Sequence, residues 1–118
     1  MAKHNDVGRE GEELAVAFLL RNGFSILHRN WRYGHLEIDL IAIKENLIHF
    51  IEVKLRSSTD FMLPENSVNK EKRAKLKRAV EQFLFLHPQY TDCRIDILSI
   101  TRHMPALTEF FFIEDVSL

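Results

Sequence analysis

The stretch that decides the fold is Leu36–Leu55, which reads LEIDLIAIKENLIHFIEVKL. Two runs rich in β-branched and aromatic residues, 36–43 and 47–55, flank the short polar connection Lys44-Glu45-Asn46. Short polar connections between two such runs are typical of hairpin loops. The stretch therefore predicts two adjacent antiparallel strands.

Helices and further strands are expected on both sides of this hairpin. Apolar residues at helical spacing predict the helices, with Asp6 and Gly23 as caps of the first. The polar segment 57–67 is expected to be a loop whose middle, 61–63, dips inward. The elements predicted are a helix over 8–22, a strand over 24–31, a turn at 33–35, the hairpin strands, a helix over about 68–86 and strands over 93–101 and 107–113. This order predicts an α/β fold with a mixed four- or five-stranded sheet flanked by helices.

Length and composition favour a single domain over residues 1–118. The chain has 118 residues, of which 46% are apolar and 28% charged, and a chain of this size buries roughly two thirds of its unfolded surface. No apolar run approaches the roughly 20 residues of a membrane span, and no signal sequence opens the chain, so we expect a cytoplasmic protein with no membrane contact. The lone Cys93 fits a reducing compartment. The net charge of -1 excludes a globally basic nucleic-acid binder, so any such role needs a local patch.

Ionisable residues gather at the end of the hairpin away from its turn. Side chains alternate along a strand, so Glu37 and Asp39 share one face of the first run, and Glu52 and Lys54 share one face of the second. A two-residue turn at Glu45-Asn46 would place Asp39 opposite Glu52 and Glu37 opposite Lys54, whereas a three-residue loop would break this pairing. Opposed carboxylates repel, and a Mg²⁺ ion, which takes one or two carboxylates plus water and phosphate oxygens, would reverse that repulsion. Lys54 would then serve the attacking water or neutralise charge as a phosphodiester is cleaved.

A structural interpretation of the same residues stays open. Glu37 and Lys54 would form an ion pair beside two acids solvated at the sheet edge. Glu12 raises the same choice on the first helix. Its helical spacing to Ala15, Val16 and Leu19 points it toward the sheet, whereas the neighbouring Glu10 and Glu13 would equally be solvated or complement the positive end of the helix dipole.

Several motifs together resemble those of the YraN-like family of bacterial proteins. They are GEELA at 11–15, RNWR at 29–32, EIDLIA at 37–42, and EVK at 52–54 followed by Arg56. That family is similar to archaeal Holliday-junction resolvases and belongs, by resemblance, to the restriction-endonuclease-like PD-(D/E)xK group. The resemblance covers nearly the whole chain and implies a restriction-endonuclease-like fold.

Carried over position by position, the resemblance also implies a site. Asp39 and Glu52 would be ligands of Mg²⁺ or Mn²⁺, Lys54 would be the catalytic lysine, and Glu12 would be a further catalytic acid presented from the first helix. Lys72 matches the family's lysine on the second helix. Because resolvase-like relatives act as dimers, a homodimer is also an expectation.

Basic residues supply candidate contacts to DNA. The segment 70–78 reads KEKRAKLKR and is either the solvated side of an amphipathic helix or a phosphate-contacting helix end, with Lys72 favoured by the resemblance. Arg29, Arg32 and Arg56 lie near the ends of the strands that carry the acids, so we expect them to steer a phosphate backbone toward the metal.

Aromatic and histidine side chains near the hairpin leave further alternatives. Trp31 and Tyr33 either pack in the core or at the sheet edge, or stack on an unpaired base. His35 is expected to lie beside the site because it is close to Glu37.

Three functions follow from this pattern. The first is a Mg²⁺- or Mn²⁺-dependent endonuclease that cleaves DNA, in branched or single-stranded form. The second is a non-catalytic module that binds nucleic acid or a partner on a nuclease fold. The third is a structural protein whose acids are vestigial.

Overall fold

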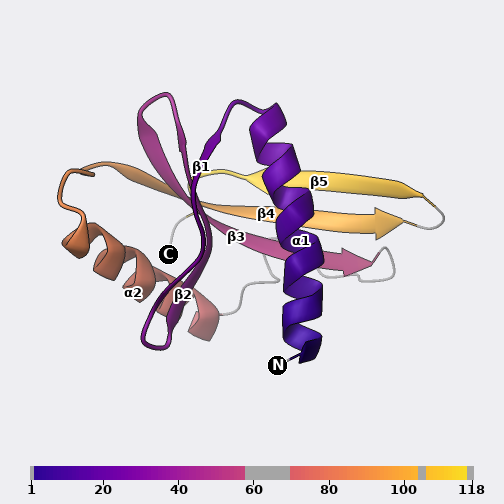
Figure 1. Ribbon diagram of the computed structural model, residues 1–118, viewed down its shortest axis with the longest axis horizontal. Coiled ribbons are helices and arrows are strands. Elements are labelled where there is room, and N and C mark those ends of the chain that lie inside the picture. The colour runs from indigo at the N-terminus through magenta and orange to yellow at the C-terminus, as the bar shows by residue number, and fades with distance from the viewer. Residues whose placement is uncertain (1, 58–69, 104–105, 117–118) are drawn as a thin grey trace.

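The computed structural model describes residues 2–57, 70–103 and 106–116, with side chains described from residue 9 onward (Figure 1). The order is a helix, three strands, a helix and two strands, as predicted. The bounds are α1 Ala2–Arg21, β1 Ser25–Tyr33, β2 Leu36–Lys44, β3 Leu47–Ser57, α2 Lys70–Leu86, β4 Cys93–His103 and β5 Leu107–Ile113. Most of the expected loop 57–67, including 61–63, lies outside the described residues.

The strands form one mixed sheet of five, in the order β1-β2-β3-β4-β5. Only the β3–β4 pair is parallel, and the other three pairs are antiparallel. Figure 1 shows α1 in front of β3 and β4, with α2 beside the β1–β2 hairpin. The sheet with its flanking helices, in this element order, is consistent with the restriction-endonuclease-like fold that the resemblance implied. No helix among the described residues is long and apolar enough to cross a membrane.

The β2–β3 hairpin has the two-residue turn on which the predicted register depended. Glu45 and Asn46 both have positive φ, at 53° and 68°. Two residues with positive φ match the twist of the adjoining strands in a tight hairpin. Lys44 therefore pairs with Leu47, as predicted, and the ladder continues in this register to Leu40 and Ile51.

A separate apolar core lies under each helix. In the α1 core the helix contributes Ala15, Val16 and Leu19, which pack on Leu40, Ala42, Ile51, Leu98 and Ile100. In the α2 core the helix contributes Leu76, Ala79, Val80 and Phe83, which pack on Ile38, Ile41, Ile48 and Phe50. The predicted stripes of both helices thus face the sheet, and the β2–β3 hairpin is buried between the two cores.

The helix ends confirm one predicted cap and contradict the other. Gly23 has a φ of 88°, and the bonds from its N–H to Leu20 and from the Phe24 N–H to Leu19 form the expected C-terminal cap. The N-cap at Asp6 was wrong, because α1 already begins at Ala2. A single interior glycine, Gly8, costs a helix only about 1 kcal/mol and does not end it.

Most strands extend one or two residues beyond their predicted ends. Tyr33, expected in the turn, belongs to β1, and the turn is Gly34–His35. Gly34 has a φ of 61°, which a residue without a Cβ adopts at little cost. The α2 helix begins at Lys70 within the described residues, so the predicted start near Val68 lies outside them.

Two phenylalanines of α2 provide a test of the α2 core. Phe83 is fully buried, whereas Phe85 is 79% exposed on the same helix. We expect Phe83→Ala to lower the free energy of unfolding by about 3–5 kcal/mol, because it removes a large side chain and leaves a cavity. Phe85→Ala is the matched control and should change it by less than about 0.5 kcal/mol. Urea unfolding of both variants measures the difference, and equal losses would contradict this packing.

Candidate functional site

The candidate site lies where β2 separates from β3. The paired positions of the ladder end at Leu40 and Ile51. Beyond them, the main-chain N–H of Val53 donates to Asp39 Oδ2 at 2.8 Å. A side-chain carboxylate thus takes over where main-chain pairing ends. We call this point, defined by Asp39, Glu52 and Val53, the fork.

One predicted pairing at the fork was wrong. Glu37 was expected opposite Lys54, but the ladder stops before these positions. Glu37 instead pairs with its cross-strand neighbour on β1, with Arg32 Nη2 at 3.6 Å from Glu37 Oε2. The separation of the strands leaves room between them, and this room becomes a pocket.

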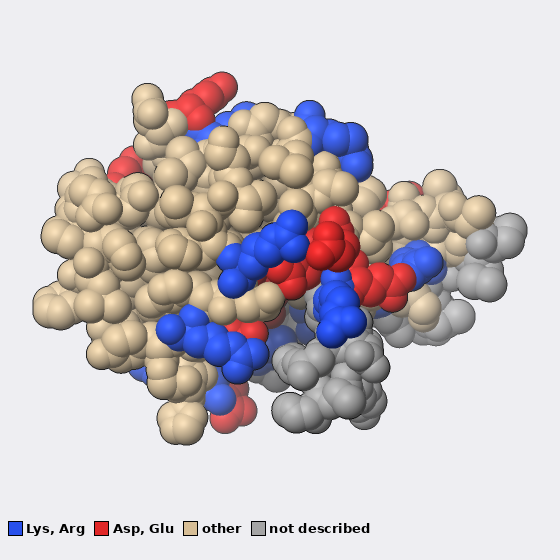
Figure 2. Space-filling model, viewed as in Figure 1, with Lys and Arg blue, Asp and Glu red and all other residues tan. Residues whose placement is uncertain are grey.

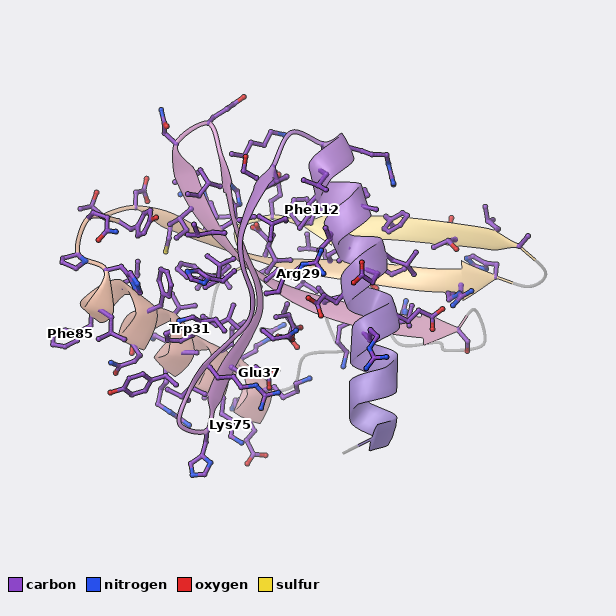
Figure 3. The ribbon with its side chains drawn as sticks, in the orientation of Figure 1. Arg29, Trp31, Glu37, Lys75, Phe85 and Phe112 are labelled. Carbon is purple, nitrogen blue, oxygen red and sulfur yellow. The ribbon has the colours of Figure 1, made fainter. Side chains whose placement is uncertain are left out.

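The pocket opens at the fork and has a volume of about 240 Å³. Figure 3 shows Glu37 from β2 and Lys75 from α2 at the same end of the hairpin. His35 lies beside the acids, as the sequence predicted. The lining residues are His35, Glu37, Asp39, Glu52, Lys72, Lys75 and Leu76. Three carboxylates and two ammonium groups therefore share one small cavity.

The carboxyl group of Asp39 has a strongly raised pKa in this pocket. Burial and the neighbouring carboxylate of Glu52, with a smaller contribution from Glu37, raise the pKa of Asp39 from 3.8 to about 7. The hydrogen bond from Val53 acts in the opposite direction. The effect of Glu52 on the pKa of Asp39 shows that the two carboxylates are close together, as the hairpin register predicted.

Two lysines balance part of this negative charge. Lys72 Nζ lies 3.4 Å from Glu52 Oε2. Lys54 follows Glu52 by two positions on β3, so it projects from the same face. Burial, and then the nearby ammonium of Lys72, lower the pKa of Lys54, while Glu52 and Asp39 act in the opposite direction. A lysine with a lowered pKa spends more time as a neutral amine, the form that can accept a proton.

Glu12 is held by β1 and does not line the pocket. Its side chain is 15% exposed, and it points toward the sheet as its helical spacing predicted. Asn30 Nδ2 donates to Glu12 Oε1 at 2.8 Å, and Arg29 Nη1 lies 3.6 Å from Glu12 Oε2 and 3.1 Å from Glu13 Oε2. Figure 3 shows Arg29 beside α1, and Figure 2 shows acidic and basic side chains adjoining one another on this face. The catalytic role of Glu12 stays a prediction.

Arg32 and Arg56 also lie outside the pocket lining. Arg32 is 63% exposed at the end of β1, where it pairs with Glu37. Arg56 is partly buried near the end of β3, beside Thr101 of β4. Both lie on strands that lead to the fork, and Arg32 forms an ion pair with the pocket residue Glu37. Their predicted contacts to nucleic acid stay predictions.

Asp39 and Glu52 fit a hard divalent cation. Mg²⁺ is bound in proteins by one or two carboxylates, with water and phosphate oxygens completing its shell. A cation between the two carboxylates would relieve the repulsion that raises the pKa of Asp39. Over 2–57, 70–103 and 106–116, no group of three or more His, Cys, Asp or Glu side chains is close enough to hold a metal. A cation at the Asp39–Glu52 pair would therefore take most of its ligands from water and phosphate oxygens.

Two features of the site were not predicted from the sequence. Lys75 lines the pocket with Lys72, and the i, i+3 spacing of these residues on a predicted helix would have revealed their common face. Asn30 has a φ of 53° and contacts Glu12. It stands in the RNWR motif, but no pattern in the chain indicates that its backbone is left-handed.

The five-stranded mixed sheet with its two helices is that of a restriction-endonuclease-like α/β protein. Its paired carboxylates lie at the fork, where two central strands separate. The chain belongs to the uncharacterised protein family UPF0102, whose family model matches residues 11–100. This confirms the resemblance to YraN-like bacterial proteins. The matched region runs from α1 to β4 and contains Glu12, Asp39, Glu52 and Lys54.

Individual relatives extend over most of both chains. The chain is 43% identical over 100 residues to a UPF0102 protein of Bacteroides thetaiotaomicron, covering 85% of this chain and 83% of that protein. It is likewise 43% identical over 100 residues to one of Flavobacterium psychrophilum, covering 85% and 84%. A UPF0102 protein of Chlorobium phaeobacteroides is 42% identical over 100 residues, covering 84% and 79%.

The raised pKa of Asp39 predicts a pH-dependent stability in the absence of divalent cations. The folded protein retains a proton on Asp39 that the unfolded chain releases above its ordinary pKa of 3.8. The free energy of unfolding should therefore fall as pH rises from 3.8 to about 7 and level off above that. Urea unfolding in EDTA over this pH range measures the effect, and in Asp39→Asn the fall in the free energy of unfolding that comes from residue 39 should be absent.

The same variant should raise the melting temperature at alkaline pH. The amide oxygen can still accept from Val53, and a neutral side chain avoids the repulsion from Glu52. We expect an increase of several degrees, since about 1 kcal/mol shifts a domain of this size by ~4 °C. Asp92→Asn, at an exposed carboxylate, is the control and should change little. A lower melting temperature for Asp39→Asn would contradict the raised pKa of this carboxyl group.

Proposed function

We propose that the protein is a Mg²⁺- or Mn²⁺-dependent endonuclease that binds DNA and cleaves its phosphodiester bonds in branched or single-stranded regions. One observation carries the proposal. Two carboxylates that repel each other, Asp39 and Glu52, share a pocket at the fork, with a lysine of lowered pKa, Lys54, on the same strand face. A structural ion pair would not require two opposed acids, whereas a metal-assisted phosphodiesterase does.

Each of these residues has a role in the proposed reaction. Asp39 and Glu52 hold the metal, which supplies a Lewis acid for the phosphate and lowers the pKa of a bound water. Lys54 takes a proton from the attacking water or stabilises the charge that develops on the phosphate. Glu12 adds a further acid from α1. These assignments follow the family resemblance and the placement of the first three residues around the fork.

A non-catalytic binding module is the second candidate, and two contacts favour it. Lys72 already neutralises Glu52 at 3.4 Å, so a cation would have to compete with an ammonium for this ligand. Glu12 is engaged by Asn30 and Arg29 instead of lining the pocket. Such a module would bind DNA in a salt-dependent manner without metal-dependent turnover.

Cleavage assays with site variants test the first proposal. The substrates are branched, nicked and single-stranded DNA with Mn²⁺, and the readout is the rate of strand scission. We expect Asp39→Ala, Glu52→Ala and Lys54→Ala each to lower the rate by about 10²- to 10³-fold, because each removes a metal ligand or a group that acts on the transition state.

Matched variants control for folding and for loss of charge. Glu13→Ala removes an exposed acid adjacent to Glu12 and should retain activity, whereas Glu12→Ala should lose it. Isothermal calorimetry with MnCl₂ adds a readout independent of turnover, and Asp39→Ala should abolish the heat of binding. Undetectable scission with every substrate, or scission that survives Asp39→Ala and Lys54→Ala, would eliminate the endonuclease proposal.

DNA affinity provides a separate test of the basic residues. We propose that Arg32, Arg56 and Lys72 contact phosphates, so each alanine variant should weaken binding and reduce the salt dependence of log K by about one unit of slope. Fluorescence anisotropy over a series of salt concentrations measures both quantities. Arg94→Ala is the control, because Arg94 pairs with Asp92 and Asp115 at the opposite end of the strands. An unchanged slope in all three variants would remove these residues from the interface.

A further inference from the structure

Two parallel aromatic rings lie at the turn end of the β1–β2 hairpin. Trp31 and Tyr33 are two residues apart on β1, so they project from the same strand face. Their ring centroids are 6.3 Å apart and the ring planes differ by 17°, which is an offset stack. Tyr33 is the outer ring and is 49% exposed.

The inner ring is fixed by the core. Trp31 meets Phe83 of α2 edge to face, with centroids 5.2 Å apart and planes at 81°. Phe83 is fully buried, and Figure 3 shows Trp31 on the side of the hairpin that faces α2. Tyr33 thus lies on Trp31, which in turn packs on the core. Core packing and base stacking were both left open for this pair, and the inner ring takes part in core packing while the outer ring is half exposed.

The surroundings of this stack are ionic and lead into the pocket. Tyr33 pairs with Leu36 across the turn, and His35 in that turn lines the pocket. Arg32, between the two aromatic residues, projects from the opposite face of β1 and pairs with the pocket residue Glu37. Lys75 contributes a cation to the same cavity. An exposed ring therefore lies at one hairpin end with groups suited to phosphates.

We propose that Tyr33 is a stacking platform for an unpaired nucleobase of a single-stranded nucleic acid whose adjoining phosphates enter the pocket at the fork. The inference rests on the proposed function for the identity of the pocket's ligand. It adds the form of the substrate: the base next to the scissile region is unstacked and open. A base inside a duplex has both faces covered by its neighbours, so it cannot lie on Tyr33, whereas any unpaired base presents a free π-face.

Tryptophan fluorescence tests this directly, because Trp31 is the only tryptophan in the chain. The probe is an oligothymidylate added to the full protein in EDTA at fixed salt, with a blunt duplex of equal length as the comparison. A base that stacks on Tyr33 adds a third ring to the Trp31–Tyr33 stack and changes the surroundings of Trp31. We therefore expect the oligothymidylate to quench the fluorescence of Trp31 saturably, and the duplex to quench it little.

Variants of Tyr33 separate stacking from non-specific binding. Tyr33→Ala should weaken the affinity for the oligothymidylate by about tenfold, as base–aromatic stacking is worth about 1–3 kcal/mol per base. Tyr33→Phe keeps the ring and should bind as the unchanged protein does. Phe85→Ala removes an exposed aromatic ring near the C-terminal end of α2, outside the pocket lining, and serves as the control. Urea unfolding of each variant confirms that it is folded, and Tyr33→Leu replaces Tyr33→Ala if the latter is not.

The outcomes distinguish this inference from the endonuclease proposal. Equal quenching by duplex and single strand, or an affinity unchanged in Tyr33→Ala, overturns the platform. Metal-dependent scission that persists in Tyr33→Ala with the same KM would overturn the platform while supporting the endonuclease. Quenching that depends on Tyr33, in a protein that cleaves nothing with Mn²⁺, would support the platform and remove the endonuclease.

Discussion

The hydrogen bond from the Val53 main chain to Asp39 is the contact on which the site depends. It closes the β2–β3 ladder with a carboxylate where the strands separate, so the same side chain ends a structural element and lines the pocket. Burial and Glu52 oppose ionisation of Asp39, and this one N–H favours it. At the fork, the carboxylate of Asp39 therefore stabilises the point where the strands separate, although burying this carboxylate in its charged form is unfavourable.

The charge distribution around the fork explains how a near-neutral chain holds such a site. The formal net charge is -1, yet carboxylates and ammonium groups adjoin one another in the pocket. Lys72 lies 3.4 Å from Glu52, and burial together with the ammonium of Lys72 lowers the pKa of Lys54, against the effect of Glu52 and Asp39. Opposite charges that cancel in the total are thus gathered in one place, because three carboxylates and two ammonium groups line the same pocket.

The sequence predicted the architecture well because its signals are local. Alternation and helical spacing predicted the element order, and the register of the β2–β3 hairpin followed only on the condition of a two-residue turn at Glu45-Asn46, which the structure has. The point at which the ladder ends was not predictable, since the alternation of Ile41 and Ile43 within the ladder continues in the sequence through Asp39 and Glu37 beyond it. The link between Glu12 and Asn30 was missed for a related reason. Asn30 adopts a positive φ of 53° without being glycine, and only tertiary contacts with α1 distinguish such a position.

The β1–β2 hairpin connects the two cores and the site. Along β1, Arg29 and Asn30 reach toward α1 through Glu12, and the next residue, Trp31, packs toward α2 on Phe83. Asn30, which has a positive φ, is the residue at which β1 changes from facing α1 to facing α2. It lies between the Arg29–Leu40 and Trp31–Ile38 pairs of the β1–β2 ladder. By continuity that position is opposite Asp39. The left-handed residue of β1 and the end of the β2–β3 ladder therefore occur at the same level of the sheet. Because β1 contacts α1 through Glu12 and α2 through Phe83 on either side of this level, Asp39 lies where the hairpin passes from one core to the other.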